Sequence, residues 1–247
     1  MTRVDSMTFA LRHADLVHAR AAAADFDAHL HGTYSVVVIT QGSAHISSSR
    51  WSRTVRAGDV FFFNPFEVHS GRSVGGLARY DVLYPAEAFL AGGEIRTDVV
   101  TRSRATRALV DALSAPDAAV EEPLRQVLAE CSFSAGSPTP ASIVRTACRL
   151  IRQGRLRSTR TEDLAREIGV NPSHLVRSFR TTIGIPPQTY ARQVRVARAR
   201  ELICAGVELD DVAQLADFSD QPHLTREFKK VFGVPPGALS RAAHRAG

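Results

Sequence analysis

The sequence predicts an α+β protein in which a small β-barrel is followed by helices and then by an all-α part with two helix-turn-helix units. Three observations predict this division. Short β-branched and aromatic segments recur over the first hundred residues, a helical motif occurs twice in the last hundred, and the net charge changes sign between them. A chain of 247 residues is long enough for two domains that each bury a core.

The predicted strands occupy residues 34–40, 43–47, 51–55, 59–63 and 78–84. They are rich in Val, Ile, Phe and Tyr, and turn residues such as Gly42, Gly58 and Pro65 stand between them. Short strands at such regular spacing are typical of an all-β sandwich or barrel. We therefore expect a small barrel with room for one small ligand.

Residues 101–132 return to helical periodicity. Two apolar stripes lie on either side of Pro116, the first from Ala105 to Leu113 and the second from Leu124 to Cys131. Such helices either pack on the barrel or pair with a second subunit, and the sequence leaves both alternatives open. Small residues and two prolines then predict a linker. The expected domains are 1–100 for the barrel, 101–132 for the helical segment, 133–140 for the linker and 141–247 for the all-α part.

One supersecondary unit occurs twice in the last third of the chain. The run that begins at Asp163 is echoed 48 residues later at Asp211, and the run that begins at His174 is echoed 49 residues later at His223. Each copy reads as a helix, a short turn and a second helix. The second copy therefore carries one extra residue in its turn.

The second helix of each copy has an apolar back and a basic front. Leu175 and Phe179 in the first copy, and Leu224 and Phe228 in the second, are four residues apart and are expected to pack inward. Such a helix suits the major groove of DNA. Residues 141–247 hold 18 Lys and Arg against 10 Asp and Glu, whereas residues 1–140 hold 13 against 15, so the positive charge lies with the repeats. The alternative is a helical hairpin repeat with merely solvated basic residues.

A connecting helix is predicted between the two copies, from Pro187 to a stop at Gly206. At ~1.5 Å per residue it would be about 28 Å long, close to the ~34 Å between successive major-groove positions on one face of B-DNA. One subunit would then reach two consecutive grooves. Arg192, Arg195 and Arg198 recur along this helix, either as a solvated face or as phosphate contacts.

The runs 164–180 and, more strongly, 218–236 resemble the AraC/XylS family of bacterial transcription regulators, and the resemblance covers about residues 143–242. It implies base contacts from the outward faces of both second helices. Arg177 and Arg226 are the candidates for reading guanine. Together with the neighbouring polar and basic side chains, the candidate DNA contacts are Ser173, Val176, Arg177, Arg180, Gln221, Pro222, Thr225, Arg226, Lys229 and Lys230. The chain departs from the family at Asp217, where a Gly is usual, so we expect a turn kept at some cost in strain.

The barrel segment carries His29-x-His31 and, further along, His69, which with its turn residues resemble the two cupin motifs. The arrangement is also similar to the effector domain of many AraC-type regulators. The glutamate usual in cupins falls at Ser35, which argues against metal-dependent catalysis, although Glu67 offers a carboxylate from another strand. We therefore predict no metal, no cofactor and no catalytic residue. The candidate ligand-binding residues are His29, His31, Tyr34, Trp51 and His69.

These observations predict a sequence-specific DNA-binding transcription regulator that responds to a small-molecule effector in the barrel. The alternative is a metal-dependent cupin enzyme with a DNA-binding appendage. Expected partners are double-stranded promoter DNA, the effector, RNA polymerase and a second copy of the chain. No segment approaches the ~20 apolar residues that span a bilayer, so we expect no membrane partner and a cytoplasmic location. Cys131, Cys148 and Cys204 are unclustered and are expected to be small buried side chains.

Overall fold

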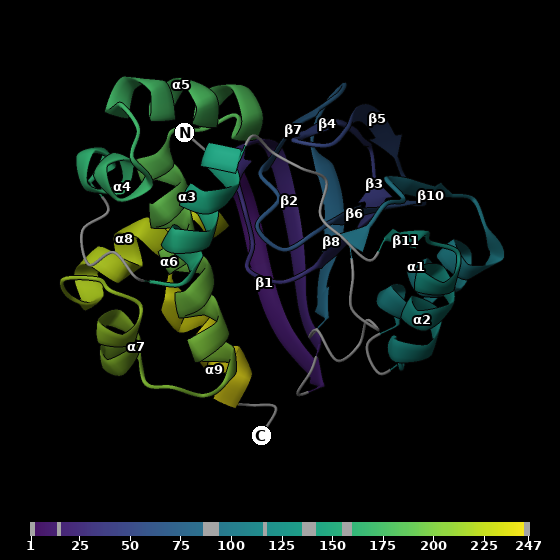
Figure 1. The fold of residues 1–247 in the computed structure, drawn as a ribbon. Coiled ribbons are helices and arrows are strands. Elements are labelled where there is room, and N and C mark those ends of the chain that lie inside the picture. Colours follow the sequence, from purple (N-terminus) through teal and green to yellow (C-terminus); the bar gives the residue numbers. More distant parts are fainter. Residues whose placement is uncertain are drawn as a thin grey trace.

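The computed structural model describes residues 3–13, 16–85, 94–115, 118–134, 142–154 and 160–244. A curled antiparallel sheet occupies the N-terminal part of the chain, and a bundle of helices packs beside it (Figure 1). The predicted α+β fold, a small cupin-like half-barrel followed by a helical part with two helix-turn-helix units, is confirmed. In the described residues no helix is long and apolar enough to cross a membrane.

The main sheet has the strand order β10-β6-β3-β8-β2-β7-β4-β5, and β1 pairs with β2 beside this path. Its strands are β1 (Arg3–His13), β2 (Leu16–His29), β3 (Ser35–Gln41), β4 (Ser43–Ser48), β5 (Ser52–Arg56), β6 (Asp59–Phe63), β7 (His69–Ser73), β8 (Ala78–Pro85) and β10 (Val99–Thr101). A second, two-stranded sheet pairs β9 (Glu94–Ile95) with β11 (Phe133–Ser134).

All five predicted strands are present, with ends that agree to within one residue, but the long strands β1 and β2 and the short strand β7 were not predicted. The run of alanines from Ala21 in β2 has high helix propensity and low strand propensity. It is a strand because β8 and β1 pair with its backbone on either side. Tertiary pairing overrides the local preference here.

The two faces of the sheet have different partners. On β3, Val37 and Ile39 belong to the apolar cluster of the barrel interior, whereas Val36 and Val38 belong to a cluster with α1 (Arg104–Ser114) and α2 (Glu121–Ala129). The apolar stripes of these two helices therefore pack on the barrel, which is one of the two alternatives that the sequence left open. Pro116 and most of the predicted linker, residues 135–140, lie outside the described residues.

The helical part contains both predicted helix pairs. Its helices are α3 (Ser142–Arg152), α4 (Thr161–Ile168), α5 (Pro172–Ile183), α6 (Pro187–Cys204), α7 (Leu209–Leu215), α8 (Gln221–Phe232) and α9 (Pro236–His244). In the first pair, α4 and α5, the helix α4 ends on the left-handed Gly169 and the side chain of Asn171 caps α5 by accepting from the backbone N–H of Ser173. The helix α6 connects this pair to the second pair, α7 and α8 (Figure 1).

The arginines along α6 brace the second helix pair. Arg192 forms an ion pair with Glu227 of α8 (Nε to Oε2, 3.1 Å), and Arg195 donates from Nη1 to the backbone oxygen of Asp217 (3.1 Å). Arg198 approaches the Asp217 carboxylate at 4.0 Å. The sequence suggested a solvated face or phosphate contacts, and the structure instead gives these side chains partners within the fold.

The turn between α7 and α8 has the strain expected of it. Asp217 has a φ of 58°, in the left-handed region, and its side chain is 68 % exposed. A β-branched residue is strongly disfavoured there, so Asp217→Val should lower the free energy of unfolding by about 1–2 kcal/mol. Asp217→Asn, which tolerates the same backbone, should change it by less than ~0.5 kcal/mol. Denaturant unfolding checks this, and equal midpoints for the two variants would contradict the assigned strain.

The three cysteines are free thiols. Cys148 is buried as predicted, whereas Cys131 and Cys204 are only partly buried. Burial raises the pKa of all three thiols, to about 12 for Cys131. They are therefore protonated at neutral pH and poorly reactive.

Candidate functional site

Three histidines meet at the mouth of the half-barrel. His29 ends β2 and lies opposite His69, the first residue of β7, across the antiparallel pair, while His31 follows β2. Their ring centroids are 4.4 Å apart for His29 and His69, 5.0 Å for His29 and His31, and 5.1 Å for His31 and His69. An irregularity in the register between Phe26 and His29 lets both of these side chains face the interior, which regular alternation would forbid.

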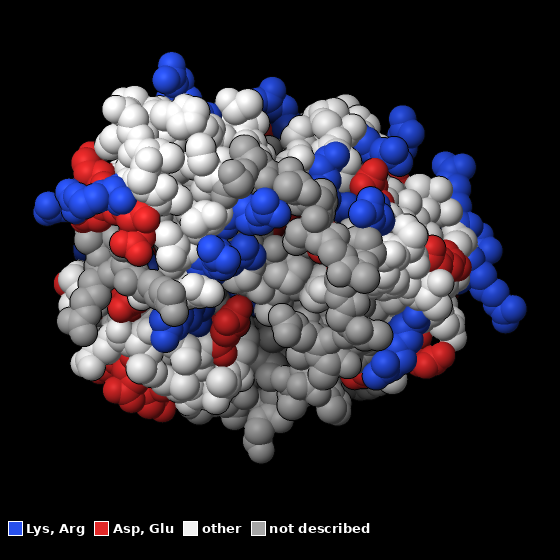
Figure 2. All heavy atoms as spheres, in the orientation of Figure 1, with Lys and Arg blue, Asp and Glu red and all other residues white. Residues whose placement is uncertain are grey.

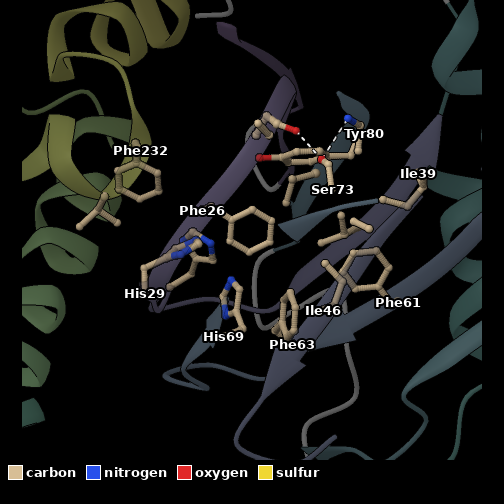
Figure 3. Close-up of a pocket in the computed structure, with 18 of the residues that line it drawn as sticks. Phe26, His29, Ile39, Ile46, Phe61, Phe63, His69, Ser73, Tyr80 and Phe232 are labelled. Atoms are coloured by element: carbon tan, nitrogen blue, oxygen red, sulfur yellow. Dashed lines mark hydrogen bonds between the residues drawn. The ribbon is translucent and has the colours of Figure 1, made fainter. Parts of the chain in front are cut away.

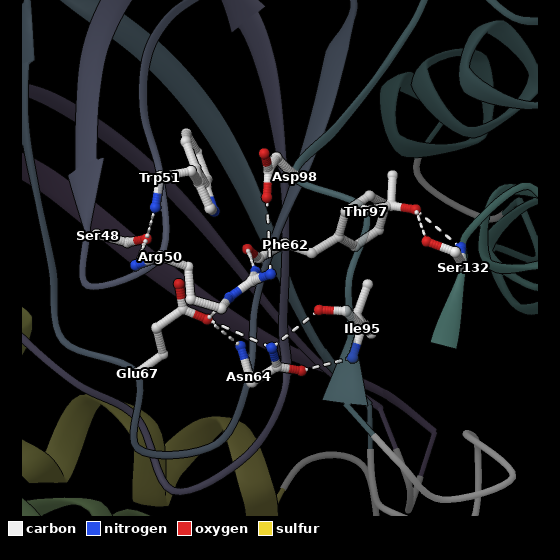
Figure 4. Close-up of polar contacts among 10 residues, drawn as sticks. All are labelled: Ser48, Arg50, Trp51, Phe62, Asn64, Glu67, Ile95, Thr97, Asp98 and Ser132. Atoms are coloured by element: carbon white, nitrogen blue, oxygen red, sulfur yellow. Dashed lines mark hydrogen bonds and ion pairs between the residues drawn. The ribbon is translucent and has the colours of Figure 1, made fainter. Parts of the chain in front are cut away.

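A buried polar network holds the loop that carries His69 (Figure 4). The Glu67 carboxylate accepts from Arg50 Nε (2.8 Å) and from the backbone N–H of Asn64 (3.0 Å) through the same oxygen, Oε2. Asn64 in turn bonds both backbone groups of Ile95. The sequence raised Glu67 as a carboxylate for the histidines, but the structure uses it as the partner of Arg50, and it is not part of the histidine cluster.

Hydrogen bonds and burial set the protonation of the cluster. The Nδ1–H groups of His29 and His69 donate to the carbonyl oxygens of Asp27 (2.8 Å) and Glu67 (2.9 Å), because a carbonyl can only accept. Burial lowers the pKa of His29 and lowers the pKa values of His31 and His69 well below the ordinary value. At neutral pH all three rings are therefore neutral, with Nε2 of His29 and His69 free of a proton.

Behind the histidines lies a small apolar cavity of about 40 Å³ (Figure 3). The figure shows His29, His69 and Phe26 at its entrance, with Phe61, Phe63, Ile39 and Ile46 deeper in the barrel. Such a volume holds only a few water molecules.

Two of the sequence candidates lie elsewhere. Tyr34 belongs to the cluster on the opposite face of the sheet with Leu109 of α1, and it lines neither the cavity nor the groove described below. Trp51 stacks on Phe63 at 5.7 Å and is not among the residues that line the cavity, so it supports the wall rather than facing a ligand. Strand parity could have excluded Tyr34, because Tyr34 has the parity of Val36, on the α1 side of β3.

The C-terminal end of α8 closes the cavity. Phe232 is 1 % exposed, lines the cavity, and stacks on His31 with a centroid distance of 5.5 Å and an interplanar angle of 25°. In the sequence Phe232 has the pattern of an ordinary helical core position, and nothing there marks it as a site residue. Its place one residue before the left-handed Gly233 puts it at the very end of α8.

The connecting helix α6 also contacts the barrel. Arg200 is buried, lies 3.7 Å above the ring of Tyr84 and donates to the Thr33 hydroxyl (2.9 Å). About two turns earlier on α6, Gln193 donates to the backbone oxygen of Ala28 (2.8 Å). The barrel thus shares one apolar cluster with the helical part, and two side chains of α6 add hydrogen bonds at their junction.

A larger groove runs along the same junction outside the cavity. Its volume is about 670 Å³, and His29 lines both the groove and the cavity. The groove is lined by four cationic side chains of α6 and α8, namely Arg192, Arg226, Lys229 and Lys230, and by the acidic Asp27 and Glu227.

The outward faces of α5 and α8 carry the ten DNA-contact candidates. Leu175, Phe179, Leu224 and Phe228 are fully buried, as predicted. Of these candidates, Val176 and Thr225 are half-buried. The others are exposed, namely Ser173, Arg177, Arg180, Gln221, Pro222, Arg226, Lys229 and Lys230. The side chain of Asp220 caps α8 by accepting from the backbone N–H of His223.

Charge differs between the turns of the helix pairs. The first turns of α4 and α7 are acidic, whereas the last turns of α4, α5 and α8 are basic. Figure 2 shows acidic side chains over α4 and α7 and basic side chains projecting over α5. The basic last turns of α5 and α8 lie on the two helices that carry the DNA-contact candidates.

Comparison with known proteins assigns both parts. Residues 13–151 match the family model of the AraC-like ligand binding domain, and residues 164–242 match a helix-turn-helix domain. YbfI of Bacillus subtilis, an uncharacterized HTH-type transcriptional regulator, is 24% identical over 235 residues, which cover 85% of this chain and 86% of the relative.

The fold as a whole is similar to that of ToxT from Vibrio cholerae. The structure of ToxT with a bound unsaturated fatty acid superposes with a TM-score of 0.57 at 15% identity, over 92% of this chain and 95% of that one. ToxT bound to (E)-4-(8-methylnaphthalen-1-yl)but-3-enoic acid gives 0.57 at 12% identity, over 94% and 100%. The chain belongs to the AraC family of transcription regulators, with an N-terminal ligand-binding domain and a helix-turn-helix DNA-binding domain.

Proposed function

We propose that this regulator reads promoter DNA with α5 and α8 in successive major grooves, and that an effector at the barrel mouth changes how α8 is held. The domains that serve these roles are those expected from the sequence, with the barrel in residues 1–100 and the DNA-binding part in residues 141–247. The observation that carries the proposal is the stacking of Phe232, the last residue of α8, on His31 of the barrel.

The geometry of α6 supports reading by both helices. It has 18 residues and would be about 27 Å long at ~1.5 Å per residue. This length is close to the ~34 Å repeat of the major groove on one face of B-DNA. In this arrangement Arg177 and Arg226 bond guanine, Val176 contacts a thymine methyl, and Arg180 and Lys229 contact phosphates.

The groove is the better place for an organic effector than the cavity. Ligand sites commonly have about 300–1,000 Å³, and the groove of about 670 Å³ falls within that range whereas the cavity of about 40 Å³ does not. Lys229 lines the groove and would pair with an acidic group, whereas Arg192 already pairs with Glu227 in the groove wall. Both ToxT structures hold carboxylic acids, which supports the same ligand class here. Occupancy would act on α8 directly, because α8 forms one wall of the groove.

Regulation rather than catalysis is proposed for the barrel, since Glu67 is engaged by Arg50 and Asn64. We place the protein in the cytoplasm, where promoter DNA lies. Contact with RNA polymerase and formation of a homodimer stay predictions. The buried stripes of α1 and α2 are already covered by the sheet, so a dimer would use other surfaces.

Selection from a randomised DNA library by the purified full chain tests the DNA-binding part of the proposal. We expect an enriched site with two half-motifs about 10–10.5 base pairs apart. Arg226→Ala should relax the preference at one position of one half-motif and cost about 1–3 kcal/mol of binding free energy, since a bidentate contact to guanine is lost.

The matched control is Arg53→Ala, which removes an exposed arginine from β5 of the barrel. It should leave the selected motif unchanged. An unaltered motif for Arg226→Ala would show that Arg226 does not read a base, and the absence of any enriched motif for the unmutated chain would refute sequence-specific binding.

A further inference from the structure

The histidine cluster has the composition and spacing of a metal site, although the sequence argued against one. One ring nitrogen each from His29, His31 and His69 can be chosen so that all lie within 4.8 Å of one another. The structure assigns to these three side chains a site for a divalent first-row transition metal, of the class of Zn²⁺, at the barrel mouth beneath α8. Bond lengths of about 2.0–2.1 Å would require the three nitrogens to move closer together around the ion.

The hydrogen bonds around the cluster orient the ring nitrogens as metal ligands require. His29 and His69 each donate from Nδ1 to the carbonyl oxygen two residues earlier in the chain. This leaves Nε2 of each ring as a lone pair. A second hydrogen bond of this kind is the usual way in which proteins fix the tautomer of a metal-bound histidine. Here the same kind of hydrogen bond occurs on β2 and on β7, which pair with each other.

The third histidine carries an unsatisfied polar atom. His31 is 6 % exposed, and its Nδ1 is buried with no hydrogen-bond partner among the described residues. Leaving such a nitrogen unpaired in an apolar setting costs free energy, and most buried polar atoms avoid it. A metal ion would either use this nitrogen as a ligand or draw the ring into an orientation that satisfies it.

The surroundings favour an ion over an organic molecule at this point. The cavity beside the cluster has about 40 Å³, which admits an ion with a water molecule but no drug-sized ligand. Glu67 lies outside the cluster, so the donor set is three neutral imidazoles, and all three rings also line the cavity. Nitrogen donors of this kind suit Zn²⁺, Co²⁺, Ni²⁺ or Cu²⁺ and not Mg²⁺ or Ca²⁺. His29 also lines the outer groove, which provides a path for the ion.

The site lies beside the end of α8, so metal binding would act on this helix. Phe232 stacks on the His31 ring, so an ion that reorients this ring alters the support of α8. This second step rests on the proposed function, whereas metal binding itself does not. The two are therefore measured separately.

The test of the site is a titration of the full-length chain, stripped with a chelator, with Co²⁺ followed by its visible absorption. We expect one equivalent to bind in the micromolar range or tighter, with nitrogen ligands in the X-ray absorption spectrum and displacement by Zn²⁺. Binding should weaken at least ~100-fold in each of His29→Gln, His31→Gln and His69→Gln, because each substitution removes one of the three metal ligands. His45→Gln, at an exposed histidine of β4, should bind as the unmutated chain does.

Circular dichroism checks that each variant is folded. If a variant is not folded, the number of nitrogen ligands measured on the unmutated chain still tests the site. Failure of the folded, unmutated chain to bind Co²⁺ stoichiometrically would overturn the site. Equal binding by His69→Gln, or equal loss in His45→Gln, would do the same. DNA affinity with and without Zn²⁺ then decides the second step: an unchanged affinity would reject the link to α8 and leave the metal site standing.

Discussion

Phe232→Ala is expected to lower the free energy of unfolding by about 3–5 kcal/mol, the range for truncating a fully buried phenylalanine. The ring is 1 % exposed, stacks on His31 and packs against Phe228 with a centroid distance of 4.6 Å. It belongs to the apolar cluster that the barrel shares with α8. Its loss should both leave a cavity and detach the end of α8 from the barrel.

Chemical denaturation measures the stability, and amide hydrogen exchange along α8 measures the detachment. Phe133→Ala is the control, because Phe133 is 43 % exposed and should change stability by less than ~0.5 kcal/mol. Phe232→Leu keeps most of the volume and should fall between the two. Equal stability of Phe232→Ala and the unmutated chain, with unchanged exchange in α8, would remove the contact on which the coupling between barrel and DNA-binding part depends.

The double variant Arg177→Ala/Arg226→Ala is expected to lose about 2–6 kcal/mol of specific binding, because two base contacts of about 1–3 kcal/mol each lie on separate helices and should add. Both side chains are exposed, so the fold should be unaffected. Binding to unrelated DNA at low salt should persist, since Arg180 and Lys229 remain to contact phosphates.

Fluorescence anisotropy on the selected site and on a scrambled site gives the specificity ratio. Arg53→Ala/Arg56→Ala removes the same charge from the barrel, where both arginines are exposed, and should leave that ratio unchanged. If the double variant in α5 and α8 weakened both DNAs by the same factor, the two arginines would be phosphate contacts and the assignment to bases would be wrong.

The helical repeat was predictable in detail because local signals and tertiary packing agree there. The apolar pairs of α5 and α8, Leu175 with Phe179 and Leu224 with Phe228, follow from helical periodicity alone, and the structure buries all four as expected. In β2 the local sequence preference and the tertiary pairing disagree. Its alanine run favours a helix locally, and only pairing with β1 and β8 makes it a strand.

The site was predictable only in part. The resemblance to the cupin motifs groups the three histidines, but their convergence depends on a register irregularity in β2 that no local pattern reveals. Phe232 lies about 200 residues from His31 in the chain, and its helical periodicity does not distinguish a barrel contact from an ordinary core position. Long-range contacts of this kind follow from how the two parts pack, which the sequence of neither part encodes alone.

Hydroxyl-radical footprinting of the full chain on its selected site tests most directly whether α5 and α8 read DNA as a pair. The account predicts two protected windows on one face of the duplex, about 10–10.5 base pairs apart, with Arg177→Ala weakening one window and Arg226→Ala the other. A single protected window, or two windows that both respond equally to either substitution, would contradict it.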